Sequence, residues 1–360
     1  MPRPIRATSS AGALAHNLRA ARALAGEAKL WAVIKANGYG HGLERTARAL
    51  EAADGFAVLD FQEAARLRLA KVDKPILMLE GIFQPQDVAL LGKYSLTPVI
   101  HHAEQVEMLR RSPPAAPIDV YVKVNSGMNR LGFTVDNLRA SVHALRELPQ
   151  VRQLTMMTHF ADADGASGIR AQLDWFGEMT KDFPAPRSLA NSAALIRFPE
   201  ARGDWARPGI MLYGGSPFGH ASADLRAEAL DLKPAMTLSS EIIATQHLQP
   251  GERIGYGFSY EAVGEMTIGI VACGYADGYP RQAPAGTPVL VNGQRARIVG
   301  RVSMDMITVD IGDIEDAYVG SPVTLWGEGL SADEVAASAG TLSYELFCAL
   351  APRVPVADAP

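Results

Sequence analysis

The sequence predicts an α/β protein in which a (β/α)₈ barrel of the TIM type is followed by a mainly antiparallel β domain. Eight short apolar runs alternate with amphipathic stretches, and the pattern changes to strand-like alternation after about Arg226. The length of 360 residues exceeds one compact core and fits a barrel of roughly 250 residues with an added domain.

The apolar runs are rich in Val, Ile and Leu, and the stretches between them, such as 43–50 and 136–148, have helical periodicity. Such runs are typical of a parallel sheet covered on both faces. Because no long gap marks a reversal of strand order, a closed barrel fits better than an open sheet. The predicted strands are 30–34, 56–59, 75–79, 96–100, 118–124, 154–158, 188–190 and 205–212.

The segment 232–328 has the pattern of an antiparallel sheet with tight turns. Its apolar or β-branched runs are separated by turn signals such as Asn292-Gly293, and one helix is expected at 331–339. The predicted strands are 236–245, 266–273, 288–291, 296–299, 306–311 and 322–326. We expect residues 1–10 to form a strand that joins this domain, residues 11–230 the barrel, and residues 231–360 the β domain.

The composition disfavours several classes of partner. The 34 Lys and Arg residues against 39 Asp and Glu residues give a net charge of −5, which does not favour nucleic acid. Cys273 and Cys348 are too few for a disulfide framework or a thiolate metal site, and they suit a reducing cytoplasm. Residues 1–6 have no apolar leader, and no apolar run approaches the length of about 18 residues that spans a membrane. We expect a cytoplasmic protein without metal, nucleic-acid or membrane partners.

Polar residues follow the predicted barrel strands, at the edge where barrels hold functional groups. They are Lys35, Asp60, Glu80, His101, Asn125, His159 and Asn191, with Arg207 inside the eighth run. Strand ends are naturally polar, and this plain explanation is favoured for Asp60, Glu80 and His101. Lys35 differs because it directly follows an apolar strand and opens the glycine-dense loop 36–42. A partly desolvated lysine is a competent nucleophile for carbonyl groups, so Schiff-base chemistry is expected.

The segment 31–42 resembles the pyridoxal-phosphate lysine motif of alanine racemases, and seven further motifs of that family follow in order. They occupy 122–133, 158–160, 191–192, 207–210, 255–257, 274–279 and 301–305. The resemblance implies an isomerase that uses pyridoxal 5′-phosphate to interconvert L-alanine and D-alanine, for the cell wall or for D-alanine breakdown. It also implies a homodimer whose active sites form between the barrel of one chain and the β domain of the other.

The resemblance implies a cofactor-binding set on the barrel. Ser192, Gly209 and Ile210 would hold the phosphate with the Tyr39 hydroxyl, and Arg207 would face the pyridine nitrogen. Arginine can only donate hydrogen bonds, so this nitrogen would stay unprotonated, which favours return of the proton to Cα over transamination. The remaining members of the implied set are Lys35, Arg130, His159 and Asn191.

Racemisation needs an acid-base group on each face of the substrate carbon. The resemblance assigns one face to Lys35 and the other to Tyr256 of the partner chain, with His159 hydrogen-bonded to Tyr256 and Arg207. Tyrosine has an ordinary pKa of about 10, so it needs nearby positive charge or hydrogen bonds to act near neutrality. Taken alone, a tyrosine between two glycines is more often a packed turn residue.

Substrate recognition and one modification are also implied by the resemblance. Carbamylation of Lys123 would convert a cation into an anion that holds Arg130. Without this modification, the two cations would repel each other. The alternative interpretation of Lys123 is an unmodified, solvated lysine. The substrate carboxylate would meet Arg130 and the Met304 backbone near Asp305. Residues of the narrow access path would be Tyr275, Arg301 and Asp164, which would exclude larger side chains.

The chain departs from the family at one position near its carboxyl end. Two alternative functions are also compatible with parts of the sequence. Some family members carry a phosphate-binding tyrosine where this chain has Pro352, and Tyr344 is a candidate replacement. A pyridoxal-phosphate decarboxylase of the same architecture has an acidic partner for the pyridine nitrogen, and Arg207 argues against it. A pyridoxal-phosphate carrier protein lacks the second domain, so residues 230–360 argue against it. The sequence leaves open the biological role and activity on serine.

Overall fold

The computed structural model describes residues 3–220 and 222–359, so Met1 and Pro2 of the predicted segment 1–10 lie outside the described part. Contacts divide the chain into two compact units, each described by itself below. The barrel unit contains Leu18–Gly38 and Leu43–Leu212, and the β unit contains Met1–Asn17, Tyr39–Gly42 and Tyr213–Pro360. Within the described ranges, no helix combines the length and the apolar character needed to cross a membrane.

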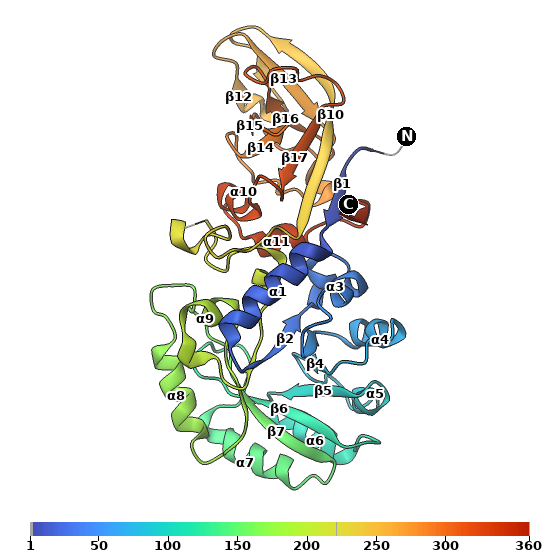
Figure 1. Ribbon diagram of the computed structural model, residues 1–360, viewed down its shortest axis with the longest axis vertical. Coiled ribbons are helices and arrows are strands. Elements are labelled where there is room, and N and C mark those ends of the chain that lie inside the picture. Colours follow the sequence, from blue (N-terminus) through green and yellow to red (C-terminus); the bar gives the residue numbers. More distant parts are fainter. Residues whose placement is uncertain (1–2, 221, 360) are drawn as a thin grey trace. The chain divides into compact units, whose positions relative to one another are not determined.

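The barrel unit is a closed ring of parallel strands, which confirms the predicted fold class (Figure 1). Each strand pairs with the next, and the ring closes through Lys29 opposite Trp205. Its strands are β2 (Lys29–Val33), β3 (Gly55–Val58), β4 (Ile76–Met78), β5 (Leu96–Ile100), β6 (Ile118–Lys123), β7 (Val151–Met157), β8 (Arg187–Ser188) and β9 (Trp205–Ala206).

Helices cover the outside of the ring (Figure 1), whereas the short segment labelled α2 is a left-handed turn at the end of β2. Several of the helices show clear local start signals; for example, Asp60 caps α4 by accepting from the Glu63 N–H, and Thr134 and Asn137 form a capping box at α7. The helices are α1 (Ala11–Ala25), α2 (Lys35–Tyr39), α3 (Leu43–Ala49), α4 (Phe61–Leu69), α5 (Asp87–Lys93), α6 (Ala103–Arg111), α7 (Val135–Arg146), α8 (Arg170–Thr180) and α9 (Ser192–Arg197).

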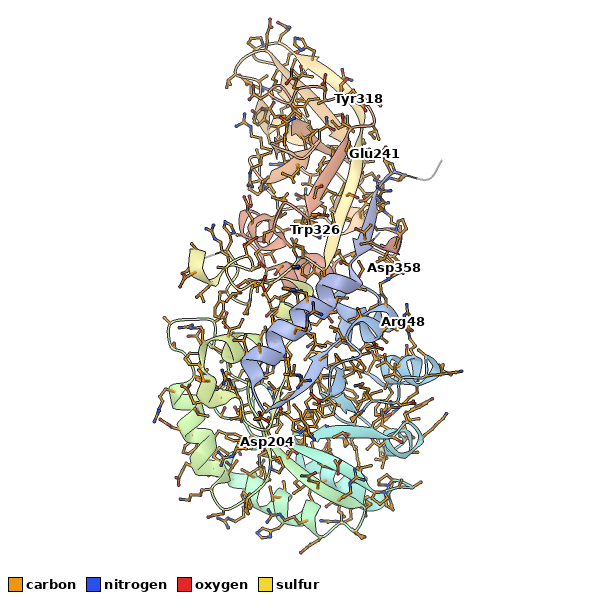
Figure 2. All side chains as sticks on the ribbon, in the orientation of Figure 1. Arg48, Asp204, Glu241, Tyr318, Trp326 and Asp358 are labelled. Atoms are coloured by element: carbon orange, nitrogen blue, oxygen red, sulfur yellow. The ribbon has the colours of Figure 1, made fainter. Side chains whose placement is uncertain are left out.

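Aromatic side chains and one aspartate stabilise the place where the last strands of the ring meet the first strand. Trp31 stacks on Trp205 with ring centroids 4.4 Å apart, and its Nε1 donates to the Tyr121 hydroxyl at 2.8 Å. Asp204, labelled in Figure 2, accepts the Arg187 N–H with its carboxylate and the Lys29 N–H with its carbonyl. These contacts join the last two strands to the first.

The β unit is built on an eight-stranded, mainly antiparallel sheet in the order β13-β16-β15-β14-β17-β10-β1-β18. The amino-terminal strand β1 pairs antiparallel with β10 and parallel with β18. Trp326, labelled on β17 in Figure 2, is buried and stacks on Tyr279. The sheet strands are β1 (Arg6–Ser9), β10 (Met236–Leu248), β13 (Met266–Val271), β14 (Pro288–Val291), β15 (Gln294–Ile298), β16 (Ile307–Asp310), β17 (Pro322–Trp326) and β18 (Val356–Asp358), with a separate hairpin of β11 (Arg253–Ile254) and β12 (Tyr260–Glu261).

Two sequence predictions of local structure were wrong. The eighth barrel strand, expected at 205–212, ends at Ala206, because Pro208 offers no N–H to a sheet and Ile210–Tyr213 forms a 3₁₀ turn. Arg207 therefore follows the strand instead of lying inside it. The segment 332–348 forms two helices, α10 (Ala332–Ser338) and α11 (Ser343–Cys348), where one was expected at 331–339.

The contacts within the chain divide the two units at Tyr213. The segment after Tyr213 has little regular structure and is held by the β unit through hydrogen bonds. The Ser216 N–H donates to Asp333 at 2.8 Å, and the Ala235 N–H donates to the Tyr213 carbonyl at 3.1 Å. Contacts of this kind leave no periodic pattern in a sequence.

Candidate active site

Lys35 begins an unusual left-handed turn at the carboxyl end of β2. Ala36, Asn37 and Gly38 have φ angles of 54°, 55° and 64°, and the Gly38 N–H donates to the Ile34 carbonyl at 2.9 Å. A left-handed conformation costs about 1–2 kcal/mol per non-glycine residue. A Cβ at Gly38 would lie 2.5 Å from the Thr46 hydroxyl, so only glycine fits there. Backbone strain of this size is typical of functional sites, and the sequence did not predict it.

The turn is held by Glu63, a buried carboxylate that the sequence analysis missed. Its Oε1 accepts from the Asn37 N–H at 2.9 Å and its Oε2 from the Leu59 N–H at 3.3 Å. The Asn37 side chain in turn accepts from the Leu43 N–H at 3.1 Å. Burial raises the pKa of Glu63 against the lowering effect of these hydrogen bonds. The carboxylate thus fixes the backbone two residues after Lys35.

Four predicted cations gather with His159 at this edge of the barrel. Burial lowers the pKa of Lys123 to about 8, and the charges of Arg207, Arg130 and Lys35 contribute. Burial also lowers the pKa of His159 well below its ordinary value, with the same cations and Lys123 adding to the effect. His159 is therefore neutral at physiological pH. An excess of positive charge of this kind favours an anionic ligand.

Arg207 directly follows β9 at this edge and is only 4% exposed. It donates to the Ser188 hydroxyl at 2.8 Å, and to the carbonyls of Thr158 at 2.7 Å and Leu189 at 3.2 Å. Burial lowers its pKa to about 10, so the guanidinium remains charged at physiological pH. These acceptors come from the ends of β7 and β8 and hold the side chain in one orientation.

The loops that follow β8 and β9 meet at the predicted phosphate residues. The buried Ser192 hydroxyl accepts from the Gly209 N–H at 2.9 Å, and Ile210 is fully buried next to this contact. Asn191 caps α9 by accepting from the Ala194 N–H at 2.9 Å. The fold therefore brings Ser192 and Gly209 into contact, with Ile210 directly after Gly209.

The predicted phosphate donor Tyr39 belongs to the β unit. Its ring stacks on Tyr213 with centroids 4.5 Å apart and lies 6.1 Å from the ring of Tyr344. Burial raises the pKa of Tyr39, so its hydroxyl remains protonated and can donate. Tyr344, the candidate replacement for a tyrosine at Pro352, is thus a neighbour of Tyr39 within this unit.

The remaining predicted residues cluster in the loops of the β unit. The Tyr275 N–H donates to the Ser303 carbonyl and the Ala276 N–H to the Met304 carbonyl, both at 3.0 Å. A Cβ at Gly274 would lie 2.3 Å from the Met304 carbonyl oxygen, so glycine permits this close contact. Tyr256 is 75% exposed in the single chain.

Other predicted strand-end residues have structural contacts. Asp60 caps α4, and His101 contacts the Glu80 carbonyl, as expected for strand-end residues with a structural role.

The predicted access-path residue Asp164 is exposed in the loop after β7. The Arg301 guanidinium lies 3.5 Å from the position of a Cβ at Gly257, beside Tyr256. The predicted residues thus form one group on the barrel edge and another in the loops of the β unit.

Residues 10–217 match the family model described as the N-terminal domain of alanine racemase, and residues 235–357 match its C-terminal domain. The chain belongs to the alanine racemase family. It is 53% identical to an alanine racemase of Ralstonia nicotianae over 100% of this chain and 96% of the relative. The structure is similar to that of a biosynthetic alanine racemase from Pseudomonas aeruginosa, with a TM-score of 0.95, 47% identity, and coverage of 99% and 100% of the two chains. It also resembles the alanine racemase of Acinetobacter baumannii, with a TM-score of 0.92, 37% identity, and coverage of 99% and 100%.

Proposed function

We propose that this protein is an alanine racemase that interconverts L-alanine and D-alanine with pyridoxal 5′-phosphate. The observation that carries the proposal is the group of cations around Lys123 and His159, which includes Lys35 and Arg207, on a barrel whose last two strands are followed by loops joined by the Ser192 to Gly209 hydrogen bond. Membership of the alanine racemase family supports it over the full length of the chain.

The residues present fit this cofactor. It carries a phosphate and a phenolic oxygen, and the barrel edge has a surplus of cations whose mutual repulsion an anion would relieve. Ser192, Gly209 and Ile210 would hold the phosphate with Tyr39, and Tyr344 would substitute for the hydroxyl that Pro352 lacks. Lys35 would bind the cofactor covalently. The wider binding set would include Arg130, His159, Asn191 and Arg207.

When bound, the cofactor supplies an electron-withdrawing ring that makes the Cα proton of the amino acid removable. Arg207 would donate to the pyridine nitrogen and keep it unprotonated, because a buried guanidinium cannot accept a hydrogen bond. This limits electron withdrawal and favours return of the proton to Cα. Lys35 would remove or return that proton on one face of the carbon.

Tyr256 of a partner chain would serve the opposite face, in a homodimer with shared active sites. Its high exposure in the single chain leaves the hydroxyl free for such a role. The substrate carboxylate would be bound by Arg130 and by the Met304 N–H near Asp305, with the ring of Tyr275 restricting the size of the side chain. A carbamate on Lys123 would orient Arg130, and the low pKa of Lys123 supplies the neutral amine that carbamylation requires.

We place the enzyme in the cytoplasm. The description of the similar Pseudomonas aeruginosa structure as biosynthetic supports a role in supplying D-alanine to the cell wall. D-Alanine breakdown remains a second candidate role.

The decisive experiment incubates the purified, cofactor-loaded protein with L-alanine and measures D-alanine by chiral chromatography. We expect both enantiomers to approach equal concentrations from either starting point. A parallel incubation with L-serine measures selectivity, and Lys35→Ala is the control. Release of CO₂ without D-alanine would instead indicate a decarboxylase, and absence of both reactions would reject the proposal.

A further inference from the structure

Asp277 is a fully buried carboxylate that receives hydrogen bonds from both ends of the chain. Its Oδ1 accepts from Arg3 Nη1 and from Arg353 Nε, each at 2.7 Å. Its Oδ2 accepts from Arg3 Nη2 at 3.1 Å and from the Gly274 N–H at 2.9 Å. The side chain is 0% exposed, so its charge depends on these partners.

Both arginines extend from Asp277 to the same neighbouring residue. Arg3 Nη2 donates to the Asp305 carbonyl at 2.7 Å, and Arg353 Nη2 donates to the Asp305 carboxylate at 2.6 Å. The four residues form a closed ring, called here the Asp277 ring, in which Arg3 bonds the backbone carbonyl of Asp305 and the other three links join charged side chains. Burial alone would raise the pKa of Asp277, but the hydrogen bonds from Arg3 and Arg353 hold it below its ordinary value.

The Asp277 ring holds the residue that directly follows Met304. The Met304 carbonyl is fixed by the Ala276 N–H at 3.0 Å, and the Ser303 N–H donates to the Met306 carbonyl at 3.0 Å. Arg3 and Arg353 restrain Asp305 through its carbonyl and its carboxylate. These contacts restrain the backbone on both sides of the Met304 N–H and leave that group to point in one direction.

We propose that Arg3 and Arg353 are positioning residues that orient the Met304 N–H for the substrate carboxylate. This inference rests on the proposed function, in which that N–H recognises alanine. The amino-terminal segment thereby contributes to substrate affinity, although no part of Arg3 is assigned contact with the substrate. Loss of one member of the ring should weaken alanine binding more than it slows turnover.

Arg3→Gln is the best test, because Arg3 is partly exposed at 38% and its removal leaves Arg353 paired with Asp277. We expect KM for alanine in the cofactor-loaded enzyme to rise about five- to tenfold, with kcat within about twofold of the parent enzyme. Arg3→Lys should restore part of the affinity, since an ammonium group can still pair with Asp277. The matched control is Arg6→Gln on β1, which should leave both constants unchanged.

A second measurement tests the ring independently of activity. Hydrogen exchange of the amides at 303–306, followed by mass spectrometry in the cofactor-loaded enzyme without alanine, should be faster in Arg3→Gln than in Arg6→Gln. Unchanged exchange would overturn the proposal, and so would faster exchange without a rise in KM. If the parent enzyme does not racemise alanine, the proposed function and the substrate role assigned to the ring both fail, whereas unchanged exchange in an active enzyme rejects only the ring.

Discussion

The Glu63 carboxylate accepts the Asn37 N–H at 2.9 Å and thereby holds the left-handed turn that begins at Lys35. Glu63→Ala should leave the N–H groups of Asn37 and Leu59 without this acceptor, at a cost of about 0.5–1.5 kcal/mol for each lost hydrogen bond. The free energy of unfolding, measured with urea, should fall accordingly. Glu44→Ala, which removes a surface ion pair with Arg66, should change it by less than about 1 kcal/mol. Equal effects of the two substitutions would contradict the role of Glu63.

Lys35 should carry the cofactor, because it alone combines a strand end with the strained turn. Borohydride reduction of the cofactor-loaded protein, followed by peptide mass spectrometry, should find pyridoxal phosphate on the peptide that contains Lys35. Lys35→Ala should abolish the label. A label on Lys123 in the parent protein would refute the assignment.

Lys123 should form a carbamate to an extent that depends on pH. Its pKa is lowered to about 8, so the neutral amine, which is the form that adds CO₂, increases as the pH rises through 8. At a fixed pressure of ¹³CO₂, the carbamate resonance in ¹³C NMR should therefore grow between pH 7 and pH 9. Lys123→Gln should lack it, whereas Lys93→Gln should retain it. A resonance that is absent from the parent protein, or that survives Lys123→Gln, would exclude carbamylation at this residue.

Arg207 should be required for both the stability of the protein and the fidelity of the reaction, and Arg207→Lys tests the first. A single ammonium group cannot satisfy the Ser188, Thr158 and Leu189 acceptors in the same geometry, and each buried group left unpaired costs about 1–3 kcal/mol. Arg207→Glu, which supplies a carboxyl group able to protonate the pyridine nitrogen, should raise pyruvate formation, the product of transamination, relative to racemisation. The exposed substitution Arg187→Lys is the control. An unchanged ratio of pyruvate to D-alanine would rule out this role for Arg207.

Tyr256→Phe should lower turnover by about 10² to 10⁴, because it removes one acid-base group and keeps the ring. Exchange of the Cα hydrogen with solvent deuterium should fail for L-alanine and persist for D-alanine through Lys35. Loss of exchange for both enantiomers would argue against a separate base on each face.

Mixing inactive Lys35→Ala and Tyr256→Phe chains tests whether the site is shared between subunits. A heterodimer of the two would contain one intact site, so partial activity should return after subunit exchange. Mixed dimers that form but remain inactive would refute the shared site.

The barrel and the sheet were predictable because the buried apolar residues of strands and helices recur at a regular spacing in the sequence. The strand Leu96–Ile100 agrees with the prediction despite Pro98, and the Asn292-Gly293 signal lies at the hairpin between β14 and β15. The eighth strand was overestimated, since an apolar run such as 205–212 has the same composition whether it forms a strand or a buried 3₁₀ turn.

The sequence by itself determined the order of the elements and the position of Lys35 at a strand end, because apolar periodicity and local capping record which face of each segment is buried. Only the tertiary structure decided the left-handed turn after Lys35, the support from Glu63, and the pairing of Arg3 with Asp277 across a separation of 274 residues. Local sequence patterns cannot predict a contact with a residue so distant in the chain. Such contacts exist only when folding brings buried charges together and removes them from water.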